Sequence, residues 1–145
     1  MTLKDILGVK GNAVWTVSKS QTVREAVELL VGRNIGALVV LDGNARVAGI
    51  ISERDILRGG HENGEGFQDL PVSRLMTRKV IVGRPEDDIQ TIMNVMTHSR
   101  IRHVPVMKDG ALQGIVSIGD IVKSLLQDSE DQIQTLKEFI YGPVM

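Results

Sequence analysis

The sequence GIISERDI at residues 49–56 returns as a close copy, GIVSIGDI, at residues 114–121, and this duplication is the strongest indication of the fold. The same order of parts precedes each copy: an extended apolar start, an amphipathic helical stretch, an apolar run, and a turn with Asp or Asn beside Gly. A repeat with this period indicates two similar units that pack together, since each unit alone is marginal for burying its own core. Any chemistry at the shared Ser-x-x-Asp pattern should therefore occur twice.

The first repeat predicts the element order β-α-β-β-α. Thr22 followed by Glu25 is a capping-box signature, and the apolar residues after it keep helical spacing. Gly36 lies where a helix commonly ends, and the apolar run after it is typical of a buried strand. The expected segments are an extended start at residues 13–17, a helix from Thr22, strands at residues 37–41 and 46–52 joined by a turn at residues 42–44, and a helix from Ser52 that Gly59 and Gly60 end.

The second repeat predicts the same order, so the fold class is mixed α/β (α+β), with two β-α-β-β-α repeats packed pseudo-symmetrically. Its expected segments are a short helix at residues 72–76, an extended start at 80–82, a helix capped by residues 87–90, hairpin strands at 103–107 and 111–117, a helix at 117–126, and a separate last helix after Asp128. The predicted parts are the N-terminal segment with the first repeat (1–60), a linker with a short helix (61–76), the second repeat (77–127), and a C-terminal amphipathic helix and tail (128–145).

Composition and charge exclude several classes of function. The 145 residues carry 17 basic and 18 acidic side chains, a formal net charge of −1, and this balance gives no support to a nucleic-acid partner. The absence of Cys excludes disulfides and thiolate metal sites, and His61 and His98 have no partners at metal-ligand spacing. The sequence begins without a signal-peptide pattern, and no apolar run reaches membrane-spanning length. We therefore expect a cytoplasmic protein without a membrane partner.

Each Ser-x-x-Asp pattern is expected where a strand ends and a helix begins. A helix N-terminus presents unpaired N–H groups and a partial positive charge, which suit a phosphate, and the Ser hydroxyl adds a donor. The Asp carboxylate lies about one helical turn further on and only accepts hydrogen bonds, so it suits the two hydroxyl donors of a ribose. The same residue types also form an ordinary helix cap, worth about 0.5–2 kcal/mol. The spacing is compatible with a phosphate–ribose site and with simple capping.

The duplicated motif, with an apolar strand pair ahead of it, resembles the CBS domain, and two such repeats in tandem resemble a Bateman module. A second family motif, an apolar strand that contains proline, is present as HVPV at residues 103–106, whereas the first repeat has ALVV at residues 37–40. The resemblance covers residues 13–126, which is nearly the whole chain. The chain looks most like the small stand-alone bacterial CBS-pair proteins of signal transduction.

The resemblance implies a non-enzymatic module that binds an adenosine-containing ligand: AMP, ADP, ATP, NAD(H) or S-adenosylmethionine. It implies that the Asp residues hold ribose hydroxyls, that the Ser residues contact phosphate or ribose, and that backbone groups at the start of each repeat line the adenine pocket. Basic residues near the Pro-containing strand would hold phosphate. The candidate binding residues are Thr16, Val17, Ser52, Arg54, Asp55, Val80, Val82, Arg100, Arg102, His103, Pro105, Ser117, Gly119 and Asp120.

The two repeats differ in charge at corresponding positions. The second repeat has Arg100, Arg102 and His103 where the first has uncharged residues, and Gly119 where the first has Arg54. Two nonequivalent sites are therefore expected, with different ligands or unequal affinities. A di- or triphosphate gains most near the arginines, because charge-assisted hydrogen bonds are the strong ones. The sequence leaves open which of the two sites these cations face.

We therefore expect a sensor of energy or redox state that binds an adenine nucleotide between the repeats and acts on an unidentified effector protein. The apolar stripe of the last helix, together with the resemblance, favours a homodimer. The alternative is an interaction scaffold in which both motifs only cap helices, and this alternative predicts no nucleotide affinity. S-Adenosylmethionine is the other ligand to weigh, although the arginine cluster disfavours its sulfonium cation. An enzyme lacks support, because the sequence has no recognisable base–nucleophile pair, metal cluster or catalytic residue.

Overall fold

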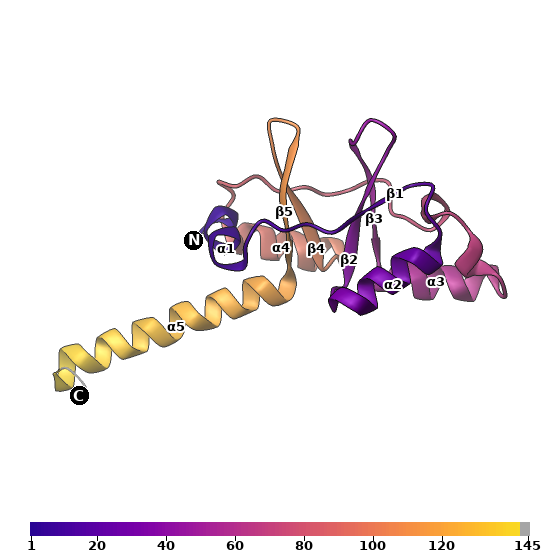
Figure 1. Ribbon diagram of the computed structural model, residues 1–145. Helices are drawn as coiled ribbons and strands as arrows, with labels where there is room; N and C mark the ends of the chain where they lie inside the picture. The colour runs from indigo at the N-terminus through magenta and orange to yellow at the C-terminus, as the bar shows by residue number, and fades with distance from the viewer. Residues whose placement is uncertain (143–145) are drawn as a thin grey trace.

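Each repeat folds around a β-hairpin, and the turns of both hairpins point to the same side of the molecule in the computed structural model, which describes residues 1–142 (Figure 1). The first repeat comprises β1 (Thr16–Ser18), α2 (Val23–Arg33), β2 (Ala37–Leu41), β3 (Val47–Ser52) and α3 (Glu53–Asn63). Strand β1 is parallel to β2, and β2 is antiparallel to β3, which gives a sheet in the order β1-β2-β3.

The second repeat has a smaller sheet. It comprises α4 (Ile89–Ser99), β4 (His103–Lys108), β5 (Ala111–Ser117) and α5 (Ile118–Tyr141), with β4 and β5 antiparallel. The extended start predicted at residues 80–82 forms no strand, and the chain meets β4 through a parallel bridge between Gly83 and Val106. Pro85 follows two residues later and has no N–H to donate, so the ladder does not continue.

The segment that precedes each repeat in the chain packs on the other repeat. Helix α1 (Leu3–Lys10) buries its apolar face in the core of the second repeat, and the 3-10 turn η2 (Val72–Arg74) buries Val72 in the core of the first. The buried core residues are Val17, Ala26, Leu30, Leu38, Val40, Ile51 and Val72 in the first repeat, and Leu3, Ile6, Leu7, Ile89, Ile92, Met96, Val104, Val106, Val116 and Ile121 in the second.

Backbone hydrogen bonds hold the two crossed segments in equivalent places. Leu3 N donates to Asp87 O at 3.0 Å, and Val72 N donates to Gln21 O at 2.7 Å. Another 3-10 turn, η1 (Phe67–Asp69), lies within the predicted linker. Each repeat therefore completes its core with a segment from before the other, although the predicted boundaries grouped these segments by chain order.

The first glycine of the repeated motif allows the crossed segment to approach the hairpin. A Cβ atom on Gly49 would lie 2.6 Å from the carbonyl oxygen of Thr77, and one on Gly114 would lie 2.6 Å from Leu7 Cδ2. A larger residue at either position would push the crossed segment away from its strand. The glycine therefore has a packing role in both copies.

Two predicted helix ends are wrong. Helix α2 ends at Arg33 and is capped by Asn34, whose φ of 52° is left-handed, and not by Gly36. Helix α3 continues through the glycine pair at residues 59–60 and ends at Asn63. The pair is there for packing, because a Cβ atom on the first glycine would collide with Leu75.

The predicted closing helix and the predicted last helix are one continuous helix, α5, which projects from the body of the molecule (Figure 1). The break predicted near Asp128 is absent, because residues 127–132 contain neither Gly nor Pro. A side-chain hydrogen bond from Gln127 to Asp131 at 3.1 Å spans this stretch one helical turn apart. The end of the predicted tail, residues 143–145, lies outside the described residues.

Candidate functional site

Both Ser-x-x-Asp motifs form capping boxes at the first turn of a helix. Ser52 Oγ accepts a hydrogen bond from Asp55 N at 3.4 Å, and Asp55 Oδ2 accepts one from Ser52 N at 2.9 Å. In the second motif the corresponding distances between Ser117 and Asp120 are 3.1 and 2.8 Å. The capping interpretation is thus confirmed for both motifs. It does not exclude a ligand, because each carboxylate can accept several hydrogen bonds.

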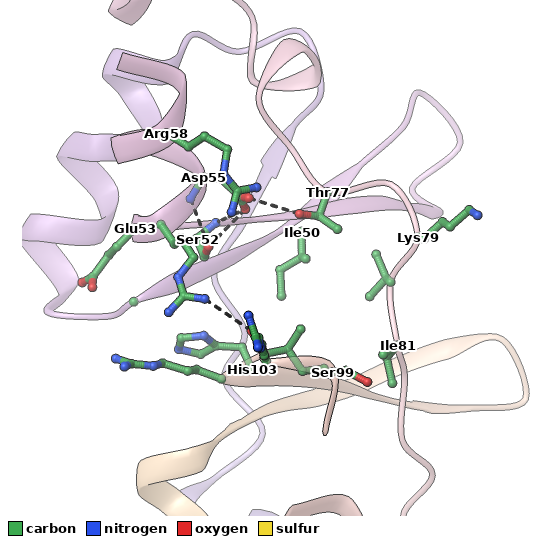
Figure 2. A pocket seen from close by; sticks show the side chains of 16 residues that line it. Ile50, Ser52, Glu53, Asp55, Arg58, Thr77, Lys79, Ile81, Ser99 and His103 are labelled. Atoms are coloured by element: carbon green, nitrogen blue, oxygen red, sulfur yellow. Dashed lines mark hydrogen bonds between the residues drawn. The ribbon is translucent and has the colours of Figure 1, made fainter. Parts of the chain in front are cut away.

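The two aspartates differ in the group that covers them. Thr77 Oγ1 donates a hydrogen bond to Asp55 Oδ1 at 3.1 Å (Figure 2). In the second motif, Lys10 Nζ donates to Asp120 Oδ2 at 2.7 Å. Both covering residues belong to crossed segments: Thr77 follows η2, and Lys10 is the last residue of α1. One carboxylate therefore meets a neutral hydroxyl and the other an ammonium group.

The Lys10 contact changes the titration of the second carboxylate. Burial raises the pKa of Asp120, but the hydrogen bonds from Lys10 and Ser117 outweigh burial and hold the pKa below its ordinary value. Asp120 is therefore ionised at neutral pH, and its charge is balanced by Lys10.

A cavity of about 440 Å³ lies beside the first motif, between the two repeats (Figure 2). Its walls are the start of α3, residues 77–81 that lead into the second repeat, and residues 99–103 at the junction of α4 and β4. The lining residues are Gly36, Ile50, Ser52, Glu53, Arg54, Asp55, Arg58, Thr77, Lys79, Val80, Ile81, Ser99, Arg100, Ile101, Arg102 and His103.

Basic side chains dominate the lining of this cavity. Arg100, Arg102 and His103 of the second repeat line it beside the first motif, which answers the question that the sequence left open. Arg54 Nη1 donates to Arg100 O at 3.5 Å and so joins the two walls. The lining includes five Lys and Arg side chains but only two carboxylates. Such an excess of positive charge suits an anionic ligand.

His103 lies between the two motifs. Burial lowers the pKa of His103, the charge of Lys10 lowers it further, and the nearby carboxylates of Glu53 and Asp120 only partly compensate. The ring packs against Gly36, where a Cβ atom would lie 3.1 Å from it. The imidazole is therefore neutral at neutral pH in the unliganded protein.

Half of the predicted binding residues line this cavity and half do not. The lining set contains Ser52, Arg54, Asp55, Val80, Arg100, Arg102 and His103. The residues outside it are Thr16, Val17, Val82, Pro105, Ser117, Gly119 and Asp120. Val17 and Pro105 are buried in strands, and the carbonyl oxygen of Pro105 already accepts a hydrogen bond from Gly83 N at 2.9 Å.

Thr77, Lys79 and Lys10 also lie at the two motifs, although they are not among the predicted binding residues. A weaker repeat could have revealed them: the pattern apolar-x-x-apolar-apolar-x-x-Lys occurs at residues 3–10 and again at residues 72–79. Because this pattern precedes each copy of the main repeat, it marks the two crossed segments that cover the aspartates.

The CBS domain family matches the chain over residues 3–62 and 72–127. The chain belongs to the CBS-domain family. It is a tandem CBS pair, a type of module that is generally regulatory and not catalytic. Among curated proteins, the mitochondrial CBS domain-containing protein CBSX3 of Arabidopsis thaliana is 36% identical and covers 97% of this chain and 72% of its own length.

Solved structures of CBS proteins have the same fold. A CBS-domain-containing protein of Agrobacterium tumefaciens is 39% identical, with a TM-score of 0.83 over 86% of this chain and 92% of its own. The CBS domain pair of protein MJ0100 is 26% identical, with a TM-score of 0.78 over 88% of this chain and 98% of its own. That pair was solved in complex with 5′-methylthioadenosine and S-adenosyl-L-methionine. The predicted family and fold class are thus confirmed.

Two further findings concern residues 1–142. None of their helices is long and apolar enough to cross a membrane. They also contain no group of three or more His, Cys, Asp or Glu side chains placed to hold a metal ion. The expected location and the expected lack of a nucleic-acid partner stay predictions.

Proposed function

We propose that the protein is a regulatory module that binds an adenine nucleotide (AMP, ADP, ATP or NAD(H)) in the cavity beside the first motif. One observation carries the proposal: Arg100, Arg102 and His103 of the second repeat line the same cavity as the Ser-x-x-Asp motif of the first. A carboxylate suited to ribose and cations suited to phosphate therefore share a cavity of about 440 Å³. Pockets for small-molecule ligands are typically about 300–1,000 Å³.

Each part of the nucleotide has a counterpart in the cavity. Asp55 would accept hydrogen bonds from the ribose hydroxyls, beside or in place of the one from Thr77. The N-terminus of α3 and the guanidinium of Arg54 would hold the first phosphate. Ile50 and Ile81 offer apolar surface for the base (Figure 2).

The charge of the lining favours a phosphate-bearing ligand within the adenosyl class. The complex of the MJ0100 pair with two adenosyl ligands supports this class for a related protein. S-Adenosylmethionine carries a sulfonium cation and no phosphate, so five surrounding Lys and Arg side chains disfavour it. Adenine nucleotides and dinucleotides gain from the same side chains.

Regulation would follow from the shared walls of the cavity. Because both repeats contribute side chains, a bound ligand would favour one relative position of the repeats. A ligand shifts such an equilibrium only by its differential affinity for the two states. We propose that an unidentified effector protein binds one of the two states in preference to the other. The module would then be a sensor of energy or redox state.

We also propose that α5 joins two copies into a homodimer. Its exposed apolar side chains Val122, Leu126, Ile133, Leu136 and Ile140 follow the heptad spacing of a coiled-coil seam. Glu130 and Lys137 occupy the same flanking position one heptad apart. In an antiparallel pair of helices, Glu130 of one copy would approach Lys137 of the other copy, and Lys137 of the first would approach Glu130 of the second. This charge complementarity favours a second copy as the partner.

A thermal-shift panel on nucleotide-free protein tests the ligand proposal, with AMP, ADP, ATP, NAD, NADH and S-adenosylmethionine as the probes. A ligand at one hundred times its Kd should stabilise the fold by about 2.7 kcal/mol. We expect the melting temperature to rise with the phosphate-bearing ligands, and Asp55→Ala to abolish the rise. Asp120→Ala should lower the melting temperature of the free protein but keep the ligand-induced rise.

Other outcomes of the panel favour the alternatives. A rise with S-adenosylmethionine alone would contradict the phosphate assignment. The absence of any rise would favour an interaction scaffold in which both motifs only cap helices.

A further inference from the structure

The second Ser-x-x-Asp motif already has an occupant from its own chain. Lys10 Nζ donates hydrogen bonds to Asp120 Oδ2 and to Ile115 O, each at 2.7 Å. The ammonium group therefore bridges the helix start and the last strand of the second repeat. Lys10 precedes the first repeat in the chain, so this contact exists only because α1 crosses over.

Helix α1 fixes Lys10 in this position. Leu3, Ile6 and Leu7 are almost fully buried in the core of the second repeat. Leu7 also packs against Gly114, where a Cβ atom would lie only 2.6 Å away. Lys10 lies in the next turn of the same helix, so its ammonium group is anchored by buried neighbours.

In the first motif, no lysine in the described part of the chain contacts the corresponding carboxylate, that of Asp55. Lys79 follows Val72 at the interval at which Lys10 follows Leu3, yet it lines the cavity and forms no ion pair with Asp55 within residues 1–142. The Thr77 hydroxyl meets that carboxylate instead. The two sites therefore have the same cap geometry, but a lysine contacts the carboxylate of the second and a threonine that of the first.

We infer that Lys10 takes the place of a ribose hydroxyl in the second site, so that each chain binds one nucleotide, at the first motif. The inference rests on the proposed function for the identity of the ligand. The Lys10 ammonium adds a charge–charge attraction to its hydrogen bond with Asp120, whereas a ribose hydroxyl brings a hydrogen bond but no charge, so the hydroxyl does not displace it readily. Lys10 is thus the residue that sets the stoichiometry, and removing its charge should open a second site.

The test is an NMR titration with ADP that reads the backbone amides of the two motifs separately. In the wild-type protein, ADP should shift the amides of residues 52–55 and leave those of residues 117–120 unchanged. Lys10→Met keeps the apolar part of the side chain but removes the ammonium group, and we expect both motifs to shift in this variant. Calorimetry should then give two ADP molecules per chain in place of one, and the second motif should bind at least about tenfold more tightly than in wild type.

Lys4→Met is the matched control, because Lys4 lies on the exposed face of the same helix and should leave one site. Lys10→Ala is the second variant if Lys10→Met does not fold. Shifts at residues 117–120 in the wild-type protein, or unchanged amides there in both Lys10 variants, would overturn the inference. Unchanged amides at residues 52–55 in every protein would instead refute the proposed function, while the readout at residues 117–120 still decides the role of Lys10.

Discussion

At the scale of single residues, the cavity combines a carboxylate from one repeat with cations from the other. Asp55 is nine-tenths buried and held by its helix cap and by Thr77. Arg100 and Arg102 are exposed and reach the cavity from the opposite wall. A buried, hydrogen-bonded acceptor and exposed cations suit a ligand with a constant ribose and a variable number of phosphates.

The double substitution Arg100→Ala with Arg102→Ala should weaken ATP binding more than AMP binding. We expect a loss of about tenfold for ATP and about threefold for AMP, because hydrogen bonds to charged groups contribute about 1.5–3 kcal/mol and exposure reduces this. Isothermal calorimetry with both nucleotides measures the difference. Arg46→Ala, on an exposed turn outside the cavity, is the control, and equal losses for the two nucleotides would contradict the phosphate assignment.

Because His103 lines the cavity, we expect nucleotide affinity to rise as the pH falls from 7.5 to 5.5. Burial and Lys10 hold the pKa of His103 below its ordinary value, and a bound phosphate would raise it, so binding takes up a proton. The affinity should increase severalfold, and His103→Gln should remove the increase. A pH-independent Kd in the wild-type protein would show that phosphate does not approach the ring.

The same shift of the His103 pKa affects the unliganded protein in the opposite direction. The unfolded chain takes up the proton near pH 6.5 and the folded protein only at lower pH, so stability should fall as the pH drops below about 6.5. Nucleotide should reduce this loss.

At the scale of elements, the crossed segments and the projecting helix carry the next two predictions. The backbone of Thr77 pairs with Ile50 through two hydrogen bonds, of 2.8 and 3.0 Å, so the segment after η2 behaves as an added edge of the first sheet. Helix α5 has the opposite character, because much of its apolar surface faces solvent. The segment after η2 is thus paired within its own chain, whereas the exposed apolar side chains of α5 can pack against a second copy.

Gly49→Ala should destabilise the protein by about 1–3 kcal/mol, because the new Cβ atom would lie 2.6 Å from the backbone oxygen of Thr77. A backbone atom cannot move aside as a flexible side chain can. Urea unfolding measures the change. Gly43→Ala is the control, since nothing lies within 4 Å of its Cβ position, and its effect should stay within about 0.5 kcal/mol. Equal effects of both substitutions would argue against the close approach.

Leu136→Glu should convert the proposed dimer to a monomer, because a charge in the middle of the seam would be buried between two helices. Sedimentation or light scattering measures the oligomeric state. Leu57→Glu is the matched control, since Leu57 is 77% exposed and lies on α3, away from the seam. A wild-type monomer at high concentration would refute the dimer.

At the scale of the whole molecule, the crossed segments make the two repeats interdependent. The first core needs Val72 and the second needs Leu3, Ile6 and Leu7. Val72 comes just before the second repeat in the chain but completes the core of the first, and the three residues of α1 come before the first repeat but complete the core of the second. A ligand bound between the repeats would therefore act on a pair that is already joined on both sides.

This interdependence predicts a single cooperative unfolding transition. Amides of the β2–β3 hairpin and of the β4–β5 hairpin should lose their native signals at the same urea concentration. If the first repeat unfolds, Val72 is exposed, and if the second unfolds, the apolar face of α1 is exposed, so each repeat holds a segment that leads into the other. Residue-resolved NMR along a urea series tests this. Two separate midpoints would show that the repeats are independent domains.

Much of the local structure was predictable from short-range patterns. The helix starts at Thr22 and Ser52, both hairpins and the duplication followed from caps, turns and apolar periodicity, which act over a few residues. The wrong helix ends also come from short-range patterns: Gly59, Gly60 and Gly36 predict helix ends, whereas they make room for Leu75, Phe67 and His103 respectively. A glycine that ends a helix and one that makes room for a neighbour have the same sequence signal.

The sequence alone was sufficient for the family, the β-α-β-β-α order and the pair of Ser-x-x-Asp motifs. Which groups meet at those motifs was established by the packing of the chain in space: Arg100 lies beside the first motif and Lys10 on the second. The Lys10–Asp120 contact joins residues 110 positions apart, and the Arg54–Arg100 contact joins residues 46 apart. No local pattern specifies such pairs, because they depend on the repeat to which each segment crosses.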